Sequence, residues 1–195
     1  KYFWDTPWFT SSPGAPERIR QAVDAAARGE TDVFEIQLTS PTGEQRWFEA
    51  SFCPILSDEQ EVVLIVPEAR DITARKKAEQ DQSRLAAIVS SSDDAIISKD
   101  LSGRILTWNR GAERMFGYAP ADAVGQSIKT IVPSNLHAEE DDILGRLARG
   151  ESIDHYETTR ITKDGAPIRV SLSVSPLKDA DGKIVGASTI ARDIT

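Results

Sequence analysis

The chain is 195 residues long, and its 31 acidic and 23 basic side chains give it a net charge of −8. The sequence also has no basic stripe of the kind that a nucleic-acid surface needs, and a single cysteine excludes an intrachain disulfide framework and a multi-cysteine zinc site. Uninterrupted apolar runs such as Val62 to Val66 are far too short to span a bilayer, and no signal-peptide pattern opens the chain. We expect a cytoplasmic chain with no nucleic-acid partner and no direct membrane insertion, although a membrane anchor elsewhere in a longer parent chain stays open.

Two short sequences occur twice in the chain, in the same order. Ala-Arg-Gly-Glu begins at Ala27 and again at Ala148, 121 residues later, while Ala-Arg-Asp-Ile-Thr begins at Ala69 and again at Ala191, 122 residues later. Two further anchors keep the offset of 122, namely Gly43 with Gly165 and Pro54 with Pro176. A one-residue gap near Thr39 to Thr42 reconciles the two offsets. The chain therefore carries two copies of one unit.

The first copy is shorter than the second at its start, because it lacks counterparts of residues 94–117. We expect residues 1–73 to be the C-terminal part of a first domain, 74–90 to be a helical linker, and 91–195 to be a complete second domain. The shorter first copy leaves the strand Val62–Val66 as an open edge, which readily recruits another strand. We expect residues ahead of Lys1 in the native gene product, or a second chain, to cover it.

The linker reads as a helix. Residues 74–88 contain no Gly or Pro and are rich in strong helix formers, and Thr73 is expected to cap the start. Ala78, Leu85 and Ile88 follow a heptad-like spacing. We expect this seam to join two chains in a parallel dimer, and a solvated connecting helix is the alternative.

The second copy opens with a hairpin and a group of helices. Residues 94–98 and 104–108 read as two strands with a turn between them. Asn109 is placed to cap a helix that stops at Gly117. Pro120 begins a short helical turn, and a longer helix is expected over about residues 137–148.

Three strands complete the second copy. We expect them at residues 156–162, 168–175 and 184–191, separated by turn signals at Gly165 and Gly182. In the middle strand, apolar and polar residues alternate, as they do in a strand with one buried face. Two strands, short helices and three further strands indicate an α+β fold with an antiparallel sheet and helices on one face.

Several motifs of the second copy, in this order, resemble the PAS (S-box) family: Asp100–Ile105, Trp108–Asn109, Glu113–Tyr118, Val124–Gly125, Thr162–Gly165 and Arg192–Thr195. The resemblance covers the chain from about residue 84 onward, and the first copy resembles the C-terminal part of another PAS domain. It implies a five-stranded antiparallel sheet of order 2-1-5-4-3 in each complete copy, two copies joined by a helical linker, and a sensory or dimerisation role in bacterial signalling proteins.

The residues do not fit the family's known cofactors. A photoreactive flavin requires a cysteine near residues 124–131, where there is none, and Cys53 is expected to point away from the core. The position of a haem ligand falls near Asp141, and the tryptophan and asparagine of redox-flavin relatives are missing from residues 154–159. We expect no haem, flavin or metal, whereas a small organic ligand and a simply filled core both stay open. The residues expected to face such a pocket are Ile97, Met115, Phe116, Leu144, Leu147, Tyr156, Leu172 and Ile190.

The Asp-Ile-Thr sequence directly follows the last strand of each copy. Asp71 and Thr73, and equally Asp193 and Thr195, are therefore the expected points of signal output. No catalytic constellation is present, so this fragment is not expected to be an enzyme. We expect the signal-input and dimerisation region of a larger protein, with a two-component sensor histidine kinase favoured. A ligand-free dimerisation scaffold, or the input region of a cyclic-dinucleotide enzyme or a transcriptional regulator, is the alternative.

Overall fold

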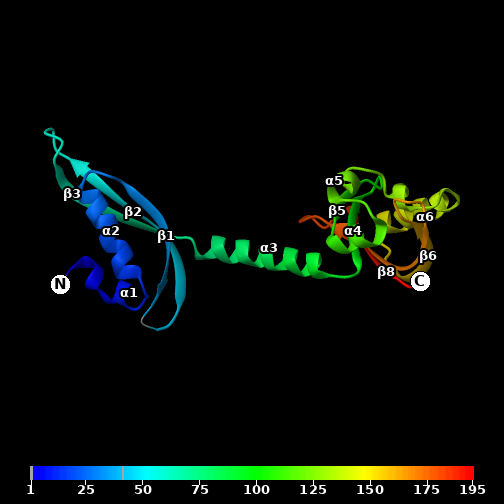
Figure 1. The fold of residues 1–195 in the computed structure, drawn as a ribbon, viewed down its shortest axis with the longest axis horizontal. Helices are drawn as coiled ribbons and strands as arrows, with labels where there is room; N and C mark the ends of the chain where they lie inside the picture. Colours follow the sequence, from blue (N-terminus) through cyan, green and yellow to red (C-terminus); the bar gives the residue numbers. More distant parts are fainter. Residues whose placement is uncertain (1, 41) are drawn as a thin grey trace. The chain divides into compact units, whose positions relative to one another are not determined.

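A computed structural model describes residues 2–40 and 42–195, and the chain divides into two compact units, Lys1–Ser83 and Arg84–Thr195. The elements of the first unit are η1 (Phe3–Asp5), α1 (Pro7–Thr10), α2 (Ala15–Ala27), β1 (Asp32–Thr39), β2 (Gln45–Leu56) and β3 (Val62–Asp71) (Figure 1). Helix α3 (Thr73–Ser91) runs across the boundary between the units.

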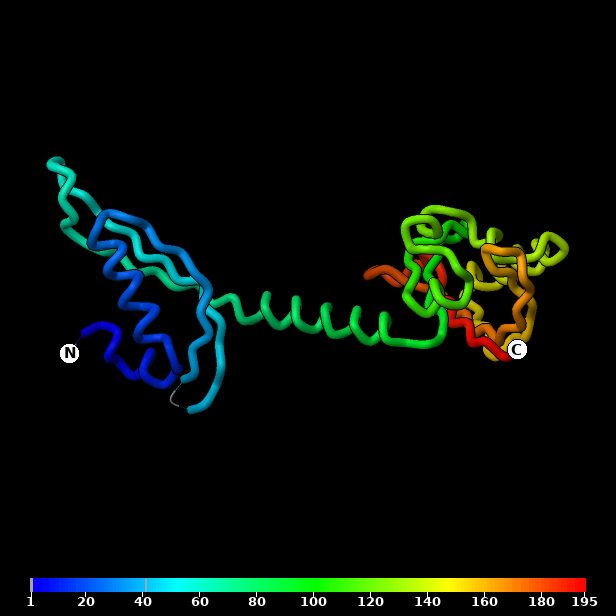
Figure 2. The backbone as a smooth tube through the Cα atoms, viewed as in Figure 1, coloured from blue at the N-terminus to red at the C-terminus, as the bar shows by residue number. Residues whose placement is uncertain are grey.

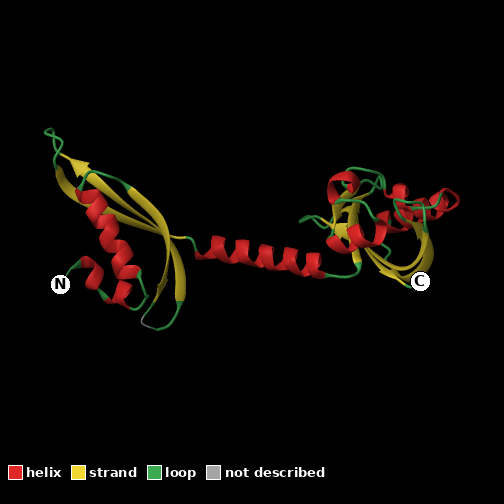
Figure 3. Cartoon of the chain, in the orientation of Figure 1, coloured by secondary structure: helices red, strands yellow, loops and turns green. Residues whose placement is uncertain are grey.

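The first unit is an antiparallel sheet of order β1-β2-β3 over the described residues, with its helices on one face (Figure 3). Ile19, Ala22 and Ala26 are spaced by three and four residues, so they lie on one side of α2. They are buried in one cluster with Ala50 and Phe52 of β2. The N-terminal segment folds back beside α2 (Figure 2), and the Phe3 ring meets the Phe52 ring edge-on at 6.3 Å.

Strand β3 is an edge strand, as the sequence predicts. Among the residues that the structure describes, it pairs with β2 alone. Val63 and Leu64 are 63% and 56% exposed, so β-branched and apolar side chains lie on a strand that has a neighbour on one side only among the described residues.

The second unit contains two strands, a group of helices and three further strands. Its elements are β4 (Ala95–Asp100), β5 (Ile105–Trp108), α4 (Arg110–Phe116), α5 (Pro120–Ala123), η2 (Ile128–Ile131), η3 (Ser134–Leu136), α6 (His137–Ala148), β6 (Ile153–Ile161), β7 (Pro167–Lys178) and β8 (Ile184–Asp193). The sheet is antiparallel with the order β5-β4-β8-β7-β6, which is the expected 2-1-5-4-3. Among the residues that the structure describes, the five-stranded sheet is thus found once, in the second unit. The first unit has a separate sheet of three strands over the described residues.

The interior of the second unit is closely packed. Ile97, Phe116 and Leu147 are at most 1% exposed and belong to one cluster. Asn109 caps α4 as predicted, since its Oδ1 accepts from the Ala112 N–H at 2.8 Å, and Gly117 ends the helix with a left-handed φ of 79°. Gly111 is required where it is, because a Cβ there would lie 2.2 Å from the Asp94 carbonyl oxygen.

The strand registers show where the one-residue gap in the alignment of the two copies lies. Equivalent pairs cross the two hairpins at an offset of 122, among them Phe34 with Ala50 and Tyr156 with Leu172. Between Ile153 and Tyr156, however, the register of β6 shifts, and His155 has a φ of +51°. The extra residue is therefore a β-bulge in β6. The gap expected near residues 39–42 was misplaced, because the sequence offers no shared anchor between Glu30 and Gly43.

Candidate functional sites: the strand-to-helix junctions and a buried charged cluster

The Asp-Ile-Thr sequence fastens the end of β3 to β2. The Ile72 N–H donates to the Trp47 carbonyl oxygen at 2.9 Å, and the Thr73 Oγ1 accepts from the Trp47 N–H at 2.9 Å. The Thr73 N–H donates to Asp71 Oδ1 at 2.8 Å. Asp71, not Thr73, therefore supplies the oxygen that takes the first N–H of α3. The expected Thr73 cap was wrong because the Thr73 hydroxyl is engaged with Trp47.

The second copy makes the same set of hydrogen bonds, and we call each set, at Asp71–Thr73 and at Asp193–Thr195, a clamp. Ile194 N–H donates to the Arg169 carbonyl oxygen at 3.0 Å, and Thr195 Oγ1 accepts from the Arg169 N–H at 3.3 Å. Thr195 N–H donates to Asp193 Oδ1 at 2.9 Å. Arg169 lies 122 residues after Trp47, so corresponding positions of the repeat make corresponding bonds.

Hydrogen bonding at each clamp changes the acidity of its aspartate. Thr73, through its side chain first and its backbone N–H second, lowers the pKa of Asp71. The Thr195 backbone N–H, followed by its side chain, lowers the pKa of Asp193. Both carboxylates are therefore held in the ionised form that accepts these bonds.

The first turns of α3 are attached to the outer face of the first sheet. Arg75 Nη2 lies 2.8 Å from Glu35 Oε1, and Lys76 forms an ion pair with the same carboxylate. Hydrogen bonds from Lys76, and then from Arg75, lower the pKa of Glu35. Lys76 Nζ also lies 5.4 Å from the centre of the Trp47 ring, within cation–π range.

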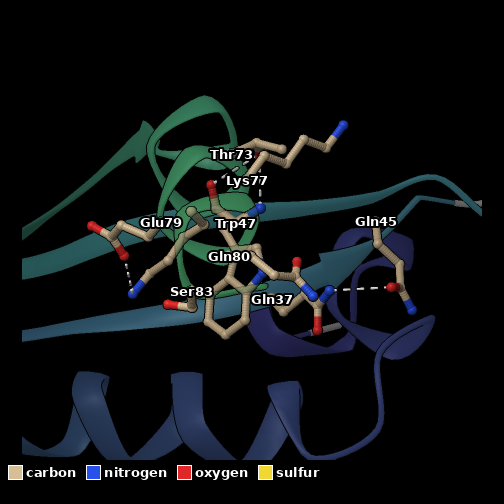
Figure 4. Close-up of a pocket in the computed structure, with 9 residues that line it drawn as sticks. Gln37, Gln45, Trp47, Thr73, Lys77, Glu79, Gln80 and Ser83 are labelled. Atoms are coloured by element: carbon tan, nitrogen blue, oxygen red, sulfur yellow. Dashed lines mark hydrogen bonds and ion pairs between the residues drawn. The ribbon is translucent and has the colours of Figure 1, made fainter. Parts of the chain in front are cut away.

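A groove of about 580 Å³ runs along this attachment (Figure 4), lined by Gln37, Gln45, Trp47, Thr73, Lys76, Lys77, Glu79, Gln80 and Ser83. Figure 4 shows the Trp47 indole between residues of α3 and the amide pair formed by Gln37 and Gln45. The residues of the groove are mostly of polar types, grouped around the Trp47 ring, and they come from β1, β2 and α3. It therefore lies where the last strand of the first unit passes into the helix.

A second candidate site is a cluster of charges inside the second unit. Lys99 of β4, Glu140 of α6 and Arg160 of β6 are each 2% exposed. Lys99 Nζ forms an ion pair with Glu140 Oε1, and Arg160 Nη2 lies 3.6 Å from Glu140 Oε2. Arg160 Nη1 donates to Glu139 Oε1 at 3.1 Å. Two cations and two carboxylates thus share one part of the core.

The sequence did contain signals for this cluster. Lys99 continues the alternation of Ala95 and Ile97, which are buried on β4. Glu140 precedes Ile143 and Leu147 by three and seven residues, so it lies on the apolar side of α6. These polar residues were missed because only apolar residues were considered for the interior.

The fold itself does not require these charges. In the repeat, Glu140 corresponds to Ile19 and Arg160 corresponds to Leu38, so the first unit has apolar residues at both positions. Burial lowers the pKa of Lys99 even though the Glu140 carboxylate opposes that effect. Burying such charges costs free energy that the mutual attraction must offset. The cluster is therefore a specific property of the second unit.

The residues expected to line a ligand pocket are only partly brought together. Ile97, Phe116 and Leu172 border a cavity of about 10 Å³, together with the charged cluster. Leu147 is buried, while Met115 and Leu144 are partly buried. This volume holds about one water molecule, so no organic ligand fits in the described conformation.

Tyr156 lies at the rim of the inner face, because it pairs with the buried Leu172 and its hydroxyl donates to Glu139 Oε2 of α6 at 3.2 Å, although the residue is 38% exposed. Ile190 does not face the interior: it is 43% exposed, so its expected inward orientation was wrong. Ile190 pairs with Ser173, whereas its neighbours Thr189 and Ala191 are buried.

Asn109 also connects the linker helix to the second unit. Its Nδ2 donates to the carbonyl oxygens of Val89 at 2.9 Å and Asp94 at 3.2 Å, and its Oδ1 accepts from the Ile96 N–H at 2.9 Å. A single buried amide therefore holds the end of α3, the start of β4 and the first turn of α4.

The expected linker seam lies on a helix that matches the prediction. Helix α3 includes all of residues 74–88. Ala78, Leu85 and Ile88 are exposed, the last two by 64% and 57%. Their part in dimerisation stays a prediction.

Cys53 is half-buried and alternates with the buried Ala50 and Phe52, so it points away from the core as expected. Within residues 2–40 and 42–195, no cluster of three or more His, Cys, Asp or Glu side chains is arranged to hold a metal ion. Over the same residues, no helix combines the length and the apolar character needed to cross a membrane.

Comparisons with known proteins agree with this architecture. Residues 83–194 match the PAS-fold family, and residues 2–77 match a second PAS-fold family. The chain belongs to the PAS-fold family. It is a tandem of PAS units of the kind found in the sensory parts of signalling proteins.

Two curated relatives and one solved structure illustrate this similarity. The chain is 27% identical over 182 residues to the biofilm dispersion protein BdlA of Pseudomonas aeruginosa, covering 92% of this chain and 43% of that protein. It is 32% identical over 84 residues to hybrid signal transduction histidine kinase D of Dictyostelium discoideum, covering 42% of this chain and 5% of that protein. A PAS-domain crystal structure from Colwellia psychrerythraea matches with a TM-score of 0.54 and 28% identity, over 59% of this chain and 98% of that one. The chain thus spans less than half the length of these curated relatives.

Proposed function

We propose that this chain is the signal-input and dimerisation region of a bacterial signal-transduction protein, with a sensor histidine kinase as the favoured parent. The observation that carries the proposal is the clamp that occurs twice, at Asp71–Thr73 and at Asp193–Thr195. Each clamp fixes the end of a last strand to its neighbouring strand. A cytoplasmic location belongs to the same proposal.

The signal leaves each unit through its last strand. In the first unit, a change in the position of β3 moves the Asp71 carboxylate, which accepts from the N–H of Thr73, the first residue of α3. The Thr73 hydroxyl bonds the same residue to Trp47 of β2. Because Arg75 and Lys76 attach the same helix turns to β1 and β2, the helix start responds to the sheet as a whole.

The test is a fusion of this chain to a histidine-kinase catalytic core, with autophosphorylation as the measurement. We expect the fusion's kinase rate to change when Asp71→Ala or Thr73→Val removes a clamp contact. The matched control is Asp58→Ala, an exposed residue of the turn between β2 and β3. Equal rates in all four proteins would refute transmission through the clamp.

Dimerisation is proposed to use the exposed seam of α3. Sedimentation of the chain should show a dimer that Leu85→Asp with Ile88→Asp disrupts. The control pair Ala87→Asp with Ser90→Asp has the same spacing and charge on exposed positions away from the seam. A monomeric wild type, or equal dissociation of both double variants, would contradict the seam.

A ligand-free scaffold is the second candidate. The cavity of about 10 Å³ in the second unit favours it, because no organic molecule fits there. Under this alternative the dimer forms, and the kinase fusion does not change its rate with any added small molecule.

A further inference from the structure

Two buried polar groups beside the charged cluster lack a hydrogen-bond partner among residues 2–40 and 42–195. They are Arg160 Nη2 and Thr189 Oγ1, on residues that are 2% and 6% exposed. Both residues border the same cavity of about 10 Å³. Leaving a polar atom unpaired in a core is unfavourable, because the atom has lost its hydrogen bonds to water, so each group calls for a partner.

We propose that this cavity is a binding site for a single neutral oxygen ligand, a water molecule that bridges Arg160 Nη2 and Thr189 Oγ1. The volume supports the identity of the occupant, because a buried water needs a cavity of roughly 10–15 Å³ and two to four polar partners. Glu140 Oε2, 3.6 Å from Arg160 Nη2, is the third group on this side of the cluster.

The charges of the cluster argue against an anion. Lys99 and Arg160 are already opposed by Glu139 and Glu140. An anionic occupant would add a negative charge with no remaining buried cation to compensate it. A neutral oxygen satisfies the guanidinium donor and the hydroxyl without changing this balance.

The first unit shows that the site is particular to the second. At the positions that correspond to Glu140, Arg160 and Thr189, it has Ile19, Leu38 and Pro67, none of which has a side-chain hydrogen-bonding group. The fold can therefore close this region without polar groups. In the second unit the water connects β6, which carries Arg160, to β8, which ends in the clamp at Asp193.

The experiment is a high-resolution crystal structure of the full chain, together with Thr189→Val and Thr189→Ser variants. We expect isolated spherical density within hydrogen-bond distance of Arg160 Nη2 and Thr189 Oγ1 in the wild type and in Thr189→Ser. Thr189→Val keeps the side-chain shape and removes the hydroxyl, so this density should be lost or strongly reduced.

Nuclear Overhauser effects between water and the amides around Thr189 provide a second measurement in solution. We expect a long-lived water signal in the wild type and in Thr189→Ser, and its loss in Thr189→Val. A dry cavity, extended density of an organic molecule, or a direct hydrogen bond from Arg160 Nη2 to a protein oxygen would each overturn the proposal. These outcomes are independent of kinase output and dimerisation, so the site and the proposed function can fail separately.

Discussion

The buried pair of Lys99 and Glu140 should behave as one energetic unit. Glu140→Gln leaves the Lys99 ammonium in the core without its carboxylate, and breaking a buried pair in this way costs about 3–5 kcal/mol. Lys99→Met removes the other partner, so the remaining cation beside Glu140 is Arg160, whose Nη2 lies 3.6 Å from Glu140 Oε2. The double variant keeps the contact between Arg160 and Glu139, so its charges balance again. We expect it to lose less stability than the two single variants together, with a coupling of about 2 kcal/mol.

The assay is urea denaturation, monitored through hydrogen exchange at individual amides of β7 and β8. A site-resolved measurement is needed because two units do not unfold as one two-state system. The control cycle uses Arg114 and Asp93, an exposed pair of the same unit with atoms 2.8 Å apart, which should show no measurable coupling. Additive losses in the buried cycle would refute the reasoning.

The same cycle predicts a pH dependence. Burial already lowers the pKa of Lys99 from 10.5, and Glu140→Gln removes the carboxylate that opposes this lowering. The unfolded chain of the variant therefore binds more protons than the folded chain at pH values between the folded pKa and 10.5. Stability must rise with pH in that window. The slope for Glu140→Gln should be absent from the double variant, which has no lysine at position 99.

The remaining predictions concern separate parts of the chain. Asn109→Ala should cost about 2–3 kcal/mol in thermal or urea unfolding of the second unit, because it removes a cap and leaves the Ile96 N–H without its partner; a loss below about 0.5 kcal/mol would contradict this account. The lowered pKa values of Asp71 and Asp193 mean that their stabilising bonds are fully present above pH 3.8 and are lost as the pH falls through the folded values; carboxyl NMR titration of the wild type should give midpoints below 3.8, and values at or above it would be inconsistent with the clamps. The purified protein should show no visible absorbance band, and a band that shifts on reduction would refute the exclusion of haem and flavin. Val63→Lys should reduce light scattering by concentrated protein, since a charge on an edge strand opposes strand pairing, whereas unchanged scattering would show that β3 is not the associating edge.

The strands, the turns and the long helix of the second unit could be predicted from its own residues, whereas the strand order was expected from the resemblance to the PAS family. Alternating residues in β7, the helix signals at Asn109 and Gly117, and the turn glycines are local features that match the structure. These signals lie within a few neighbouring residues. The repeat is a signal of another kind, because its copies lie 121 and 122 residues apart, and it predicted that the first copy lacks counterparts of the first two strands.

The interior of the site could not be predicted as well. Ile190 was assigned to the wrong face because the apolar residues Ile190 and Ala191 are adjacent in β8, and only the packed sheet decides which of them faces the helices. Lys99 and Glu140 are 41 residues apart, so their ion pair exists only once β4 and α6 pack together. An isolated lysine in a strand normally indicates a solvent-facing position. The partner that makes its burial tolerable becomes visible only in three dimensions.

The clamp at the end of each unit has a consequence for how such proteins diversify. Its bonds connect Asp71–Thr73 to Trp47, and Asp193–Thr195 to Arg169, so each clamp is closed by residues of its own unit. Because the bonds at the end of the last strand are made within one unit, they stay in place when a different segment follows Thr73 or Thr195. Genetic exchange at this boundary can therefore join a PAS unit to a different following domain without removing the hydrogen bonds that end its last strand.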